Sequence, residues 1–338
     1  MITKIRLTNF RNFKAQVFEF SNKTTVIVGP NASGKTNVLE SIYAASTGKS
    51  FKASLQEEMI NHKAEIARVK AKVGGDILEV ILTRGENGWP TKKLLINGVG
   101  KRLVDFAGIF RVVAFGPQDL DLVTESPSHR RGFLDTVLSQ VDREYRRAIL
   151  SYEKGLRQRN RLLWRIREEG TNRSQLLFWN QLLIKNGDNL SAARQGLIDF
   201  INQTGAINSQ DFSLDYDKSA ISEARLAQYA TEEIAAATTL VGPHRDDFVF
   251  RLKKRDLARF GSRGEQRMGV LWLKLAELAF VEEKAGERPT LLLDDIFSEL
   301  DHDHRKVVMA VVRSKQAIIT TADPHFVKGL KGVEKISL

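Results

Sequence analysis

The segment Gly29-Pro30-Asn31-Ala32-Ser33-Gly34-Lys35-Thr36 limits the possible folds of this chain more than any other feature. It matches the phosphate-binding pattern G-x-x-x-x-G-K-[ST] and follows residues 26–28, an apolar run typical of a buried parallel strand. Its glycines let successive backbone N–H groups turn toward phosphates, and the N-terminus of the next helix adds partial positive charge. An ordinary glycine-rich turn is the alternative. We predict that residues 29–36 bind nucleotide phosphates, with Lys35 on the β/γ-phosphates and the Thr36 hydroxyl on Mg²⁺.

A second apolar run, Thr290-Leu291-Leu292-Leu293-Asp294-Asp295, ends in two acidic residues. A strand that lies beside a phosphate loop needs a carboxylate at its end to hold Mg²⁺, as in a Walker B element. Such runs are common by themselves, but the combination with a phosphate loop is more specific. We predict that Asp294 binds Mg²⁺ and that Asp295 polarises the attacking water as a general base.

A third motif, Gly261-Ser262-Arg263-Gly264-Glu265-Gln266-Arg267, lies before the acidic strand and opens a predicted helix over residues 264–284. A serine hydroxyl, a glycine N–H and a helix N-terminus together form an anion site. One compact head cannot readily enclose a single γ-phosphate with two such sites. We therefore expect this one to serve the nucleotide of another subunit, with a simple helix N-cap as the alternative interpretation.

The composition of the 338-residue chain excludes several classes of protein. With 52 Lys+Arg and 41 Asp+Glu, its net charge of +11 favours a polyanionic partner, either nucleic acid or an acidic membrane face. The count of 0 Cys excludes disulfides, thiolate zinc sites and cysteine nucleophiles, and it is consistent with a reducing cytoplasm. No segment approaches the roughly 20 apolar residues that span a bilayer, and the first residues alternate as in a strand. We expect a cytoplasmic protein without a signal peptide or a membrane partner.

Three stretches of different pattern indicate two domains, as does the length at roughly 150 residues per domain. Residues 1–120 favour strands with one helix, and an Asn97-Gly98 turn belongs to a predicted β-meander. Residues 121–239 are helical and rich in arginine, and residues 240–338 return to alternating helices and strands. We predict an α/β head built from residues 1–120 and 240–338, with the helical lobe inserted. The helical patterns also predict three core tryptophans, Trp164, Trp179 and Trp272.

The motifs resemble those of ATP-binding-cassette (ABC) P-loop ATPases of the SMC/Rad50-like branch, which maintains and repairs chromosomes. Within that branch they resemble the RecF family of recombination mediators, over essentially the whole chain. This implies an ABC-type ATPase head with an inserted α-helical lobe. Besides the three motifs above, the resemblance rests on Asn9-Phe10-Arg11-Asn12, Asn37-Val38-Leu39-Glu40-Ser41-Ile42-Tyr43, Phe115-Gly116-Pro117-Gln118-Asp119-Leu120, Gly242-Pro243-His244-Arg245-Asp246-Asp247-Phe248 and Ser298-Glu299-Leu300-Asp301.

The resemblance implies ATP and Mg²⁺ as cofactors and gives each motif a role. Gln118 would sense Mg²⁺ and the attacking water, and Asp301 would end the D-loop that crosses a dimer interface. Ser262 and Gly264, with Gln266 beside them, would bind the γ-phosphate held by the partner subunit. Further residues expected near the nucleotide are Arg11, Asn12, Asn37 and, at the switch position after the last strand, Thr320 or Thr321.

Two positions depart from the patterns of related ATPases. Glu265 stands where the family usually has Gln, and its negative charge is expected to weaken ATP-driven closure. Asp295 is shorter than the Glu that transporters have at this place, so it would hold the water less well. We therefore expect slow hydrolysis, with ATP acting as a clamp more than as a fuel.

The function that the resemblance implies is ATP-dependent DNA binding in recombinational repair. An ATP-driven homodimer would clamp duplex DNA near single-strand gaps and assist recombinase loading with RecR and RecO. Two alternatives remain open. One is an SMC-like standalone ATPase that drives a separate nuclease or DNA-defence partner. The other is a module in which the nucleotide only holds a DNA-binding dimer together.

The Arg-rich stretch over residues 157–173 is the hypothesised DNA track, because Arg and Lys neutralise phosphates irrespective of base sequence. A solvated helix face with internal ion pairs is the alternative, since Glu153, Glu168 and Glu169 lie among the arginines. His244 fits either a role near the DNA or the dimer interface, or a structural one.

Overall fold

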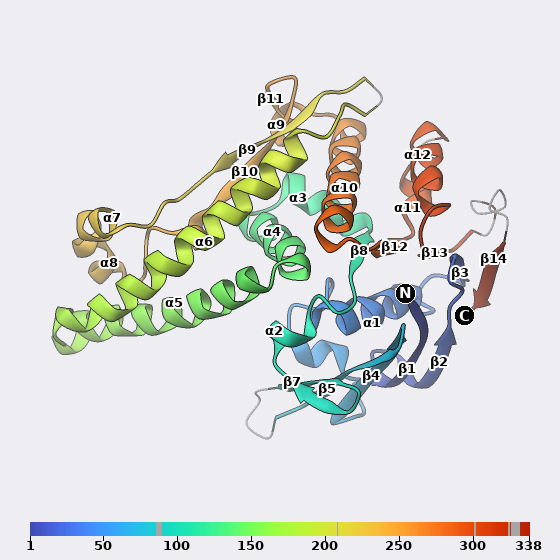
Figure 1. Ribbon diagram of the computed structural model, residues 1–338, viewed down its shortest axis with the longest axis horizontal. Helices are drawn as coiled ribbons and strands as arrows, with labels where there is room; N and C mark the ends of the chain where they lie inside the picture. The colour runs from blue at the N-terminus through green and yellow to red at the C-terminus, as the bar shows by residue number, and fades with distance from the viewer. Residues whose placement is uncertain (86–89, 208, 301, 324, 326–331) are drawn as a thin grey trace. The chain divides into compact units, whose positions relative to one another are not determined.

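The computed structural model in Figure 1 describes residues 1–85, 90–207, 209–300, 302–323, 325 and 332–338. The chain divides into two compact units, one of Met1–Asp119 with Val281–Leu338 and one of Leu120–Phe280. The first boundary lies one residue from the division expected after residue 120. The second differs from the one expected after residue 239, because β10 (Asp247–Leu252) pairs with β9 (Phe212–Asp217) and so belongs to the second unit.

A five-stranded parallel sheet forms the centre of the first unit, in the order β14-β3-β13-β12-β8. Its strands are β3 (Thr24–Val28), β8 (Val112–Phe115), β12 (Thr290–Asp294), β13 (Ala317–Thr321) and β14 (Val333–Ser337). Every residue of β12 and β13 is buried, as expected for parallel strands covered on both faces. The register pairs Asp294 with Thr320 and Val28 with Thr321. The loop after β3 and the acidic end of β12 therefore lie at the same edge.

A six-stranded antiparallel sheet completes the first unit, in the order β2-β1-β4-β5-β6-β7. The strands are β1 (Ile2–Phe10), β2 (Phe13–Glu19), β4 (Ile66–Val73), β5 (Asp76–Thr83), β6 (Thr91–Ile96) and β7 (Val99–Lys101). The predicted meander is confirmed, and Asn97 and Gly98 both have positive φ in its last turn. One hydrophobic core joins both sheets to α1 (Lys35–Thr47), with side chains such as Leu7, Ile42 and Ile318.

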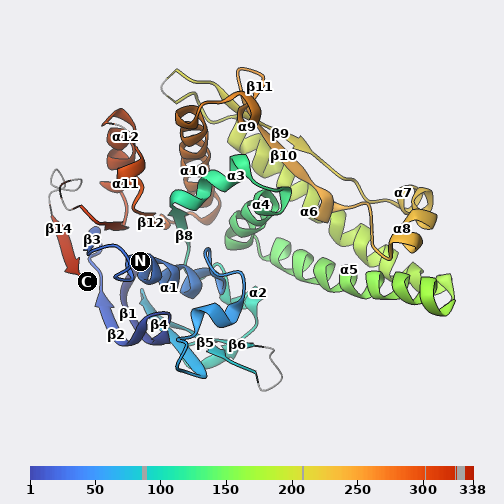
Figure 2. The ribbon, with the colours of Figure 1, turned by 180° about the vertical axis from the view of Figure 1, so that it is seen from behind.

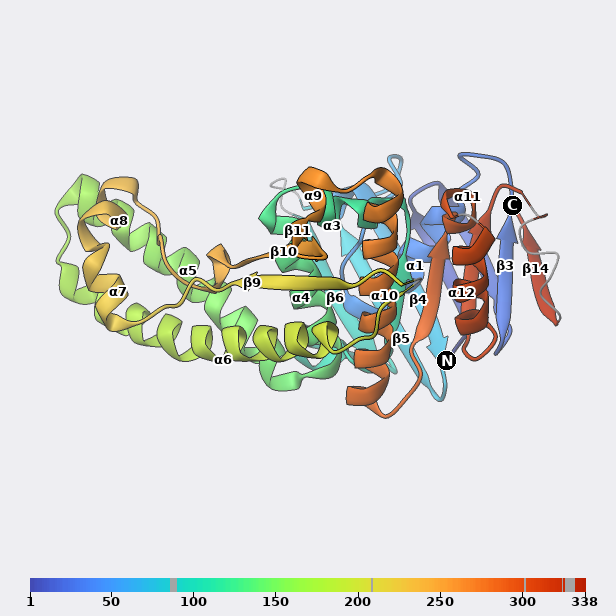
Figure 3. The same cartoon turned by 90° about the horizontal axis from the view of Figure 1, so that it is seen from above.

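Two long helices dominate the second unit, α5 (Arg143–Glu169) and α6 (Leu176–Asn202), which lie side by side in Figures 1 and 3. Their backbones approach closely at Gly155, where a Cβ atom would come within 2.5 Å of Leu182. The tryptophan predictions have mixed outcomes. Trp272 is buried in α10 (Arg263–Ala285), but Trp164 is 46% exposed because it lies on the solvent side of α5, and Trp179 is half-buried.

The remaining helices and strands are shorter, and Figure 2 shows them from behind. The helices are α2 (Leu103–Phe106), α3 (Asp121–Thr124), α4 (Pro127–Val141), α7 (Glu223–Gln228), α8 (Ala230–Ala236), α9 (Leu257–Phe260), α11 (Ile296–Glu299) and α12 (His302–Val312). Single 3₁₀ turns occupy Gln56–Met59, Pro117–Leu120, Arg173–Gln175 and Pro243–Arg245, and β11 (Arg255–Asp256) edges the small sheet β11-β10-β9. Among the described residues, no helix combines the length and the apolar character that crossing a membrane requires.

Candidate nucleotide-binding site

The phosphate loop connects β3 to α1, and its shape depends on glycine. Gly34 has φ 105°, and a Cβ atom there would come within 2.6 Å of the Asn12 side chain. Lys35 folds across the loop and donates hydrogen bonds to the carbonyl oxygens of Gly29 (2.8 Å) and Pro30 (2.9 Å). The loop therefore holds an ammonium group against its own backbone, directly before the N-terminus of α1, where anions are favoured.

The second half of the site lies at the end of β12. Thr36 Oγ1 donates to Asp294 Oδ1 at 2.9 Å, and Thr320 Oγ1 donates to the same oxygen at 2.7 Å. Asp294 is only 7% exposed, so these two hydroxyls fix its carboxylate in one orientation. The sequence motifs for the phosphate loop and the acidic strand thus meet in space. The direct contact of Thr320 with Asp294 was not expected, although the parallel register of the two strands explains it.

Asp295 and Gln118 border the same carboxylate. Asp295 has φ 49° in the left-handed region, and its N–H donates to Thr320 Oγ1 at 3.1 Å. Gly116 lies between the side chains of Asp294 and Gln118, because a Cβ atom on it would lie 3.3 Å from Asp294 Cβ and 3.3 Å from Gln118 Oε1. The first unit therefore brings together the predicted metal ligands Thr36, Asp294 and Gln118.

The side chains of Arg11 and Asn12 have different hydrogen-bond partners. The guanidinium of Arg11 is bound by the buried carboxylate of Glu40 on α1 (2.6 and 2.8 Å) and donates to the Glu58 carbonyl (2.7 Å). This ion pair, rather than the phosphate loop, occupies the Arg11 side chain. Asn12 does reach the loop, since its Nδ2 donates to the Ser33 carbonyl at 3.2 Å and its Oδ1 accepts from Asn37 Nδ2 at 2.8 Å.

A cavity of 490 Å³ in the first unit lies beside the phosphate loop, because its lining includes Asn12, which donates to the Ser33 carbonyl, and Asn37, which directly follows the loop. Most of its other polar lining is basic. The side chains that give the cavity this character are Lys14, Lys52, His62 and Lys63. The basic lining therefore favours an anionic ligand beside the loop.

The third motif lies in the second unit, where it opens α10. Ser262 Oγ accepts from the Glu265 N–H at 3.3 Å, and Glu265 Oε2 accepts from the Ser262 N–H at 2.7 Å. This is a reciprocal capping box, and the Ser262 N–H lowers the pKa of Glu265. Ser262 and Gly264 are exposed, whereas Gln266 is buried and donates to the Leu257 carbonyl at 3.2 Å. Gln266 therefore does not share the exposed surface of Ser262 and Gly264.

The expected D-loop and switch residues lie near the end of the chain. Asp301, the expected D-loop residue, lies outside the described residues. Thr321 Oγ1 donates to the Asp323 carbonyl at 3.0 Å and thereby shapes the turn after β13. Of the two threonines at the expected switch position, Thr320 is the one that contacts Asp294.

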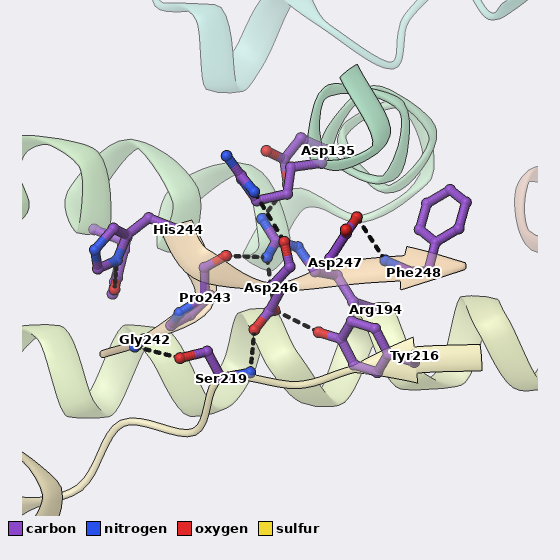
Figure 4. Close-up of polar contacts among 12 residues, drawn as sticks. Asp135, Arg194, Tyr216, Ser219, Gly242, Pro243, His244, Asp246, Asp247 and Phe248 are labelled. Carbon is purple, nitrogen blue, oxygen red and sulfur yellow. Dashed lines mark hydrogen bonds and ion pairs between the residues drawn. The ribbon is translucent and has the colours of Figure 1, made fainter. Parts of the chain in front are cut away.

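His244 is a structural residue of the second unit. One ring nitrogen, Nδ1, lies 2.9 Å from the Tyr152 hydroxyl, and Nε2 lies 3.0 Å from the Thr239 carbonyl. Burial lowers the pKa of His244 to about 4, so the ring is neutral at physiological pH. Figure 4 shows it beside the polar cluster of the Gly-Pro-His-Arg-Asp-Asp run.

The arginines of α5 are partly committed to internal ion pairs. Arg159 is 2% exposed and bonds to Glu233 at 2.6 Å, so it cannot contact DNA from this position. Arg165 and Arg167 pair with Glu169 and Glu168 at 2.8 and 2.7 Å. Among the described residues of the Arg-rich stretch 157–173, three arginines are exposed and form no ion pair: Arg157, Arg161 and Arg173.

Comparison with known proteins places these features in a family. The sequence model for the RecF/RecN/SMC N terminal domain matches residues 1–337. The DNA replication and repair protein RecF of Herpetosiphon aurantiacus is 35% identical over 357 residues, covering 95% of this chain and 92% of that protein. The chain belongs to the RecF family. The RecF protein of Clostridium tetani is 34% identical, covering 98% of this chain and 96% of its own length.

The fold agrees with this membership. A solved structure described as the recombination mediator protein RecF-ATPrS in the RecFOR pathway has a TM-score of 0.88, with 31% identity over 99% of this chain and 96% of that chain. The predicted fold class, an α/β ABC-type ATPase head with an inserted helical lobe, is confirmed. RecF membership places the chain among the ATPases of DNA replication and repair.

Proposed function

We propose that this chain binds Mg²⁺-ATP at residues 29–36, pairs with a second copy when ATP is bound, and clamps duplex DNA near single-strand gaps. RecR and RecO would assist it in loading recombinase. The observation that carries the proposal is the hydrogen bond from Thr36 to Asp294. The two residues are 258 positions apart in the chain, and they meet at the edge of the parallel sheet where the phosphate loop leads into α1. A RecF structure similar to this chain is described as RecF-ATP, which supports ATP as the nucleotide.

The residues present fit Mg²⁺-ATP. Gly34 opens a backbone cradle that any side chain would fill, and Lys35 supplies a point charge for the β/γ-phosphates. Thr36 and Asp294 offer a hydroxyl and a carboxylate oxygen, the ligand types that Mg²⁺ prefers. When bound, the metal would stabilise the charge that develops on the phosphates.

The short side chain of Asp295 supports slow hydrolysis. Its backbone lies in the left-handed region and its N–H is bonded to Thr320, so the carboxylate reaches less far toward a water than a Glu would. Glu265 contributes less to slow hydrolysis than the sequence indicates, because its carboxylate is bonded at the N-terminus of its own helix, which offsets part of its negative charge. Asp295 would act as the general base, and Gln118 would orient the water.

ATP-driven pairing can be tested by replacing Ser262 with Asp. Asp caps helices as well as Ser does, but its negative charge would repel the γ-phosphate of the other subunit. We expect Ser262→Asp to bind ATP like the parent and to weaken ATP-dependent dimerisation about tenfold or more, because opposed like charges cost several kcal/mol. Light scattering across a concentration series with Mg²⁺-ATP measures this.

The matched control is Ser222→Asp, which makes the same change at the N-cap of α7, where Ser222 Oγ accepts from the Arg225 N–H at 3.2 Å. It should dimerise like the parent. Dimerisation of Ser262→Asp at the parent's concentration would remove the second anion site from the proposal.

A further inference from the structure

In the antiparallel sheet of the first unit, the neighbouring strands β1 and β4 have one apolar and one strongly basic face. Alternation along β1 and β4 buries residues such as Leu7 and Val69 in the core. The opposite face is open to solvent and carries five cationic side chains on these two neighbouring strands, which Figures 1 and 2 show together. We call this the basic sheet face, and it consists of Lys4, Arg6, Arg68, Lys70 and Lys72.

The register of the two strands places like charges opposite each other. Lys4 pairs with Lys72, and Arg6 pairs with Lys70. Like charges at directly opposed positions destabilise a sheet. Stability of the isolated fold therefore does not account for this arrangement, whereas a polyanion bound across the strands would.

The neighbouring acids neutralise only part of this charge. Glu19 bonds to Lys4 at 2.8 Å, and the largely buried Glu79 lies 3.1 Å from Arg68 and 3.7 Å from Lys70. Five cations and two acids leave a net charge of +3. Arg6 and Lys72 are exposed and form no ion pair with the described residues.

The spacing of these groups suits a nucleic-acid backbone. Alternate residues of a strand lie about 6.7 Å apart, so Arg68, Lys70 and Lys72 span about 13 Å. A strand of duplex DNA presents one phosphate per roughly 3.4 Å of axis, or about four phosphates over that length. The outward positions of β1, β4 and β5, all within the described residues, carry no aromatic side chain. Stacking of single-stranded bases is therefore not supported there.

We propose that the basic sheet face binds the phosphate backbone of duplex DNA. This rests on the proposed function, of which it names the contact surface. It differs from the hypothesised track on α5, where Arg159 is buried and both Arg165 and Arg167 have acidic partners. The contact is independent of base sequence, because it involves charged groups and phosphates alone.

The test compares two double variants with the same change in net charge. Arg6→Glu with Lys72→Glu changes the sheet face, and Arg157→Glu with Arg161→Glu changes α5. Binding to a fluorescent duplex of random sequence is titrated with Mg²⁺-ATP at several salt concentrations. We expect the sheet variant to lose about tenfold or more in affinity at ~150 mM salt, and its salt slope to fall by about 1.8, which is two phosphate contacts. The α5 variant should lose clearly less.

A stability measurement separates contact from misfolding. Each sheet substitution places Glu opposite a cation, Lys70 in one case and Lys4 in the other, so the midpoint of thermal unfolding should rise rather than fall. Parental DNA affinity in the sheet variant, or an equal loss in both variants, would overturn the inference while leaving ATP-gated DNA binding intact. A single strand that competes as well as duplex would also overturn it. If the parent itself binds no duplex, the proposed function fails.

Discussion

Asp294→Asn should lower the rate of ATP hydrolysis about 100-fold or more, because the metal site loses its buried negative charge. The substitution is nearly isosteric. Its remaining carbonyl oxygen still accepts from the hydroxyls of Thr36 and Thr320, which lie 2.9 and 2.7 Å from the carboxylate in the parent. Fold and loop geometry should therefore persist. Phosphate release at saturating Mg²⁺-ATP measures the effect.

Asp295→Asn is the companion variant. Asn tolerates the left-handed backbone at φ 49° as well as Asp does, so the substitution removes the charge without straining the turn. It should retain ATP binding and lose turnover. Parental hydrolysis by Asp294→Asn would contradict the assigned metal site. Parental ATP consumption by Asp295→Asn would favour the interpretation in which nucleotide only holds a dimer together.

Arg194→Met should destabilise the second unit by about 3–5 kcal/mol, because it leaves buried carboxylates without their cation. Arg194 is 2% exposed and bonds to Asp246 and Asp135, each at 2.8 Å, and to the Pro243 carbonyl at 2.7 Å. The Tyr216 hydroxyl also donates to Asp246, and burial raises the pKa of Tyr216, so this proton stays in place (Figure 4). The cluster joins α4, α6, β9 and the residues before β10.

The matched control is Arg251→Met, which breaks the half-exposed pair with Asp215 at 2.8 Å between β10 and β9. Such pairs contribute about 0–1 kcal/mol. Urea unfolding of both variants, followed by far-UV circular dichroism, gives the comparison. Equal loss of stability in the two variants would show that the buried ion pairs of Arg194 contribute no more to the free energy of unfolding than the half-exposed pair of Arg251.

Local motifs made much of the site predictable from the sequence. The phosphate loop and the acidic strand are contiguous runs, and their chemistry implies both their secondary structure and their meeting point at one sheet edge. The N-cap that Ser262 forms on α10 agrees with the alternative interpretation of the third motif. The apolar run from Thr290 to Asp294 is confirmed as the buried strand β12.

Contacts between distant residues were not predictable. No pattern connects Arg11 to Glu40, or Arg159 to Glu233, so one arginine was expected at the phosphates and the other on a DNA track. The boundary of the helical unit was displaced for a similar reason, since the pairing of β9 with β10 depends on tertiary structure. Helical periodicity likewise predicted Trp164 in the core, but its side chain is exposed, whereas the neighbouring Leu163 and Ile166 are buried.

The central claim is that ATP gates DNA binding, and sedimentation of a fluorescent duplex tests it most directly. The protein is mixed with the duplex at ~150 mM salt, the physiological ionic strength, with either Mg²⁺-ATP or Mg²⁺-ADP. We expect a heavier complex with ATP alone, which is lost in Lys35→Ala because the loop then lacks its phosphate-binding ammonium. Equal sedimentation with both nucleotides would mean that the charge of +11 binds DNA unaided, and it would contradict the clamp.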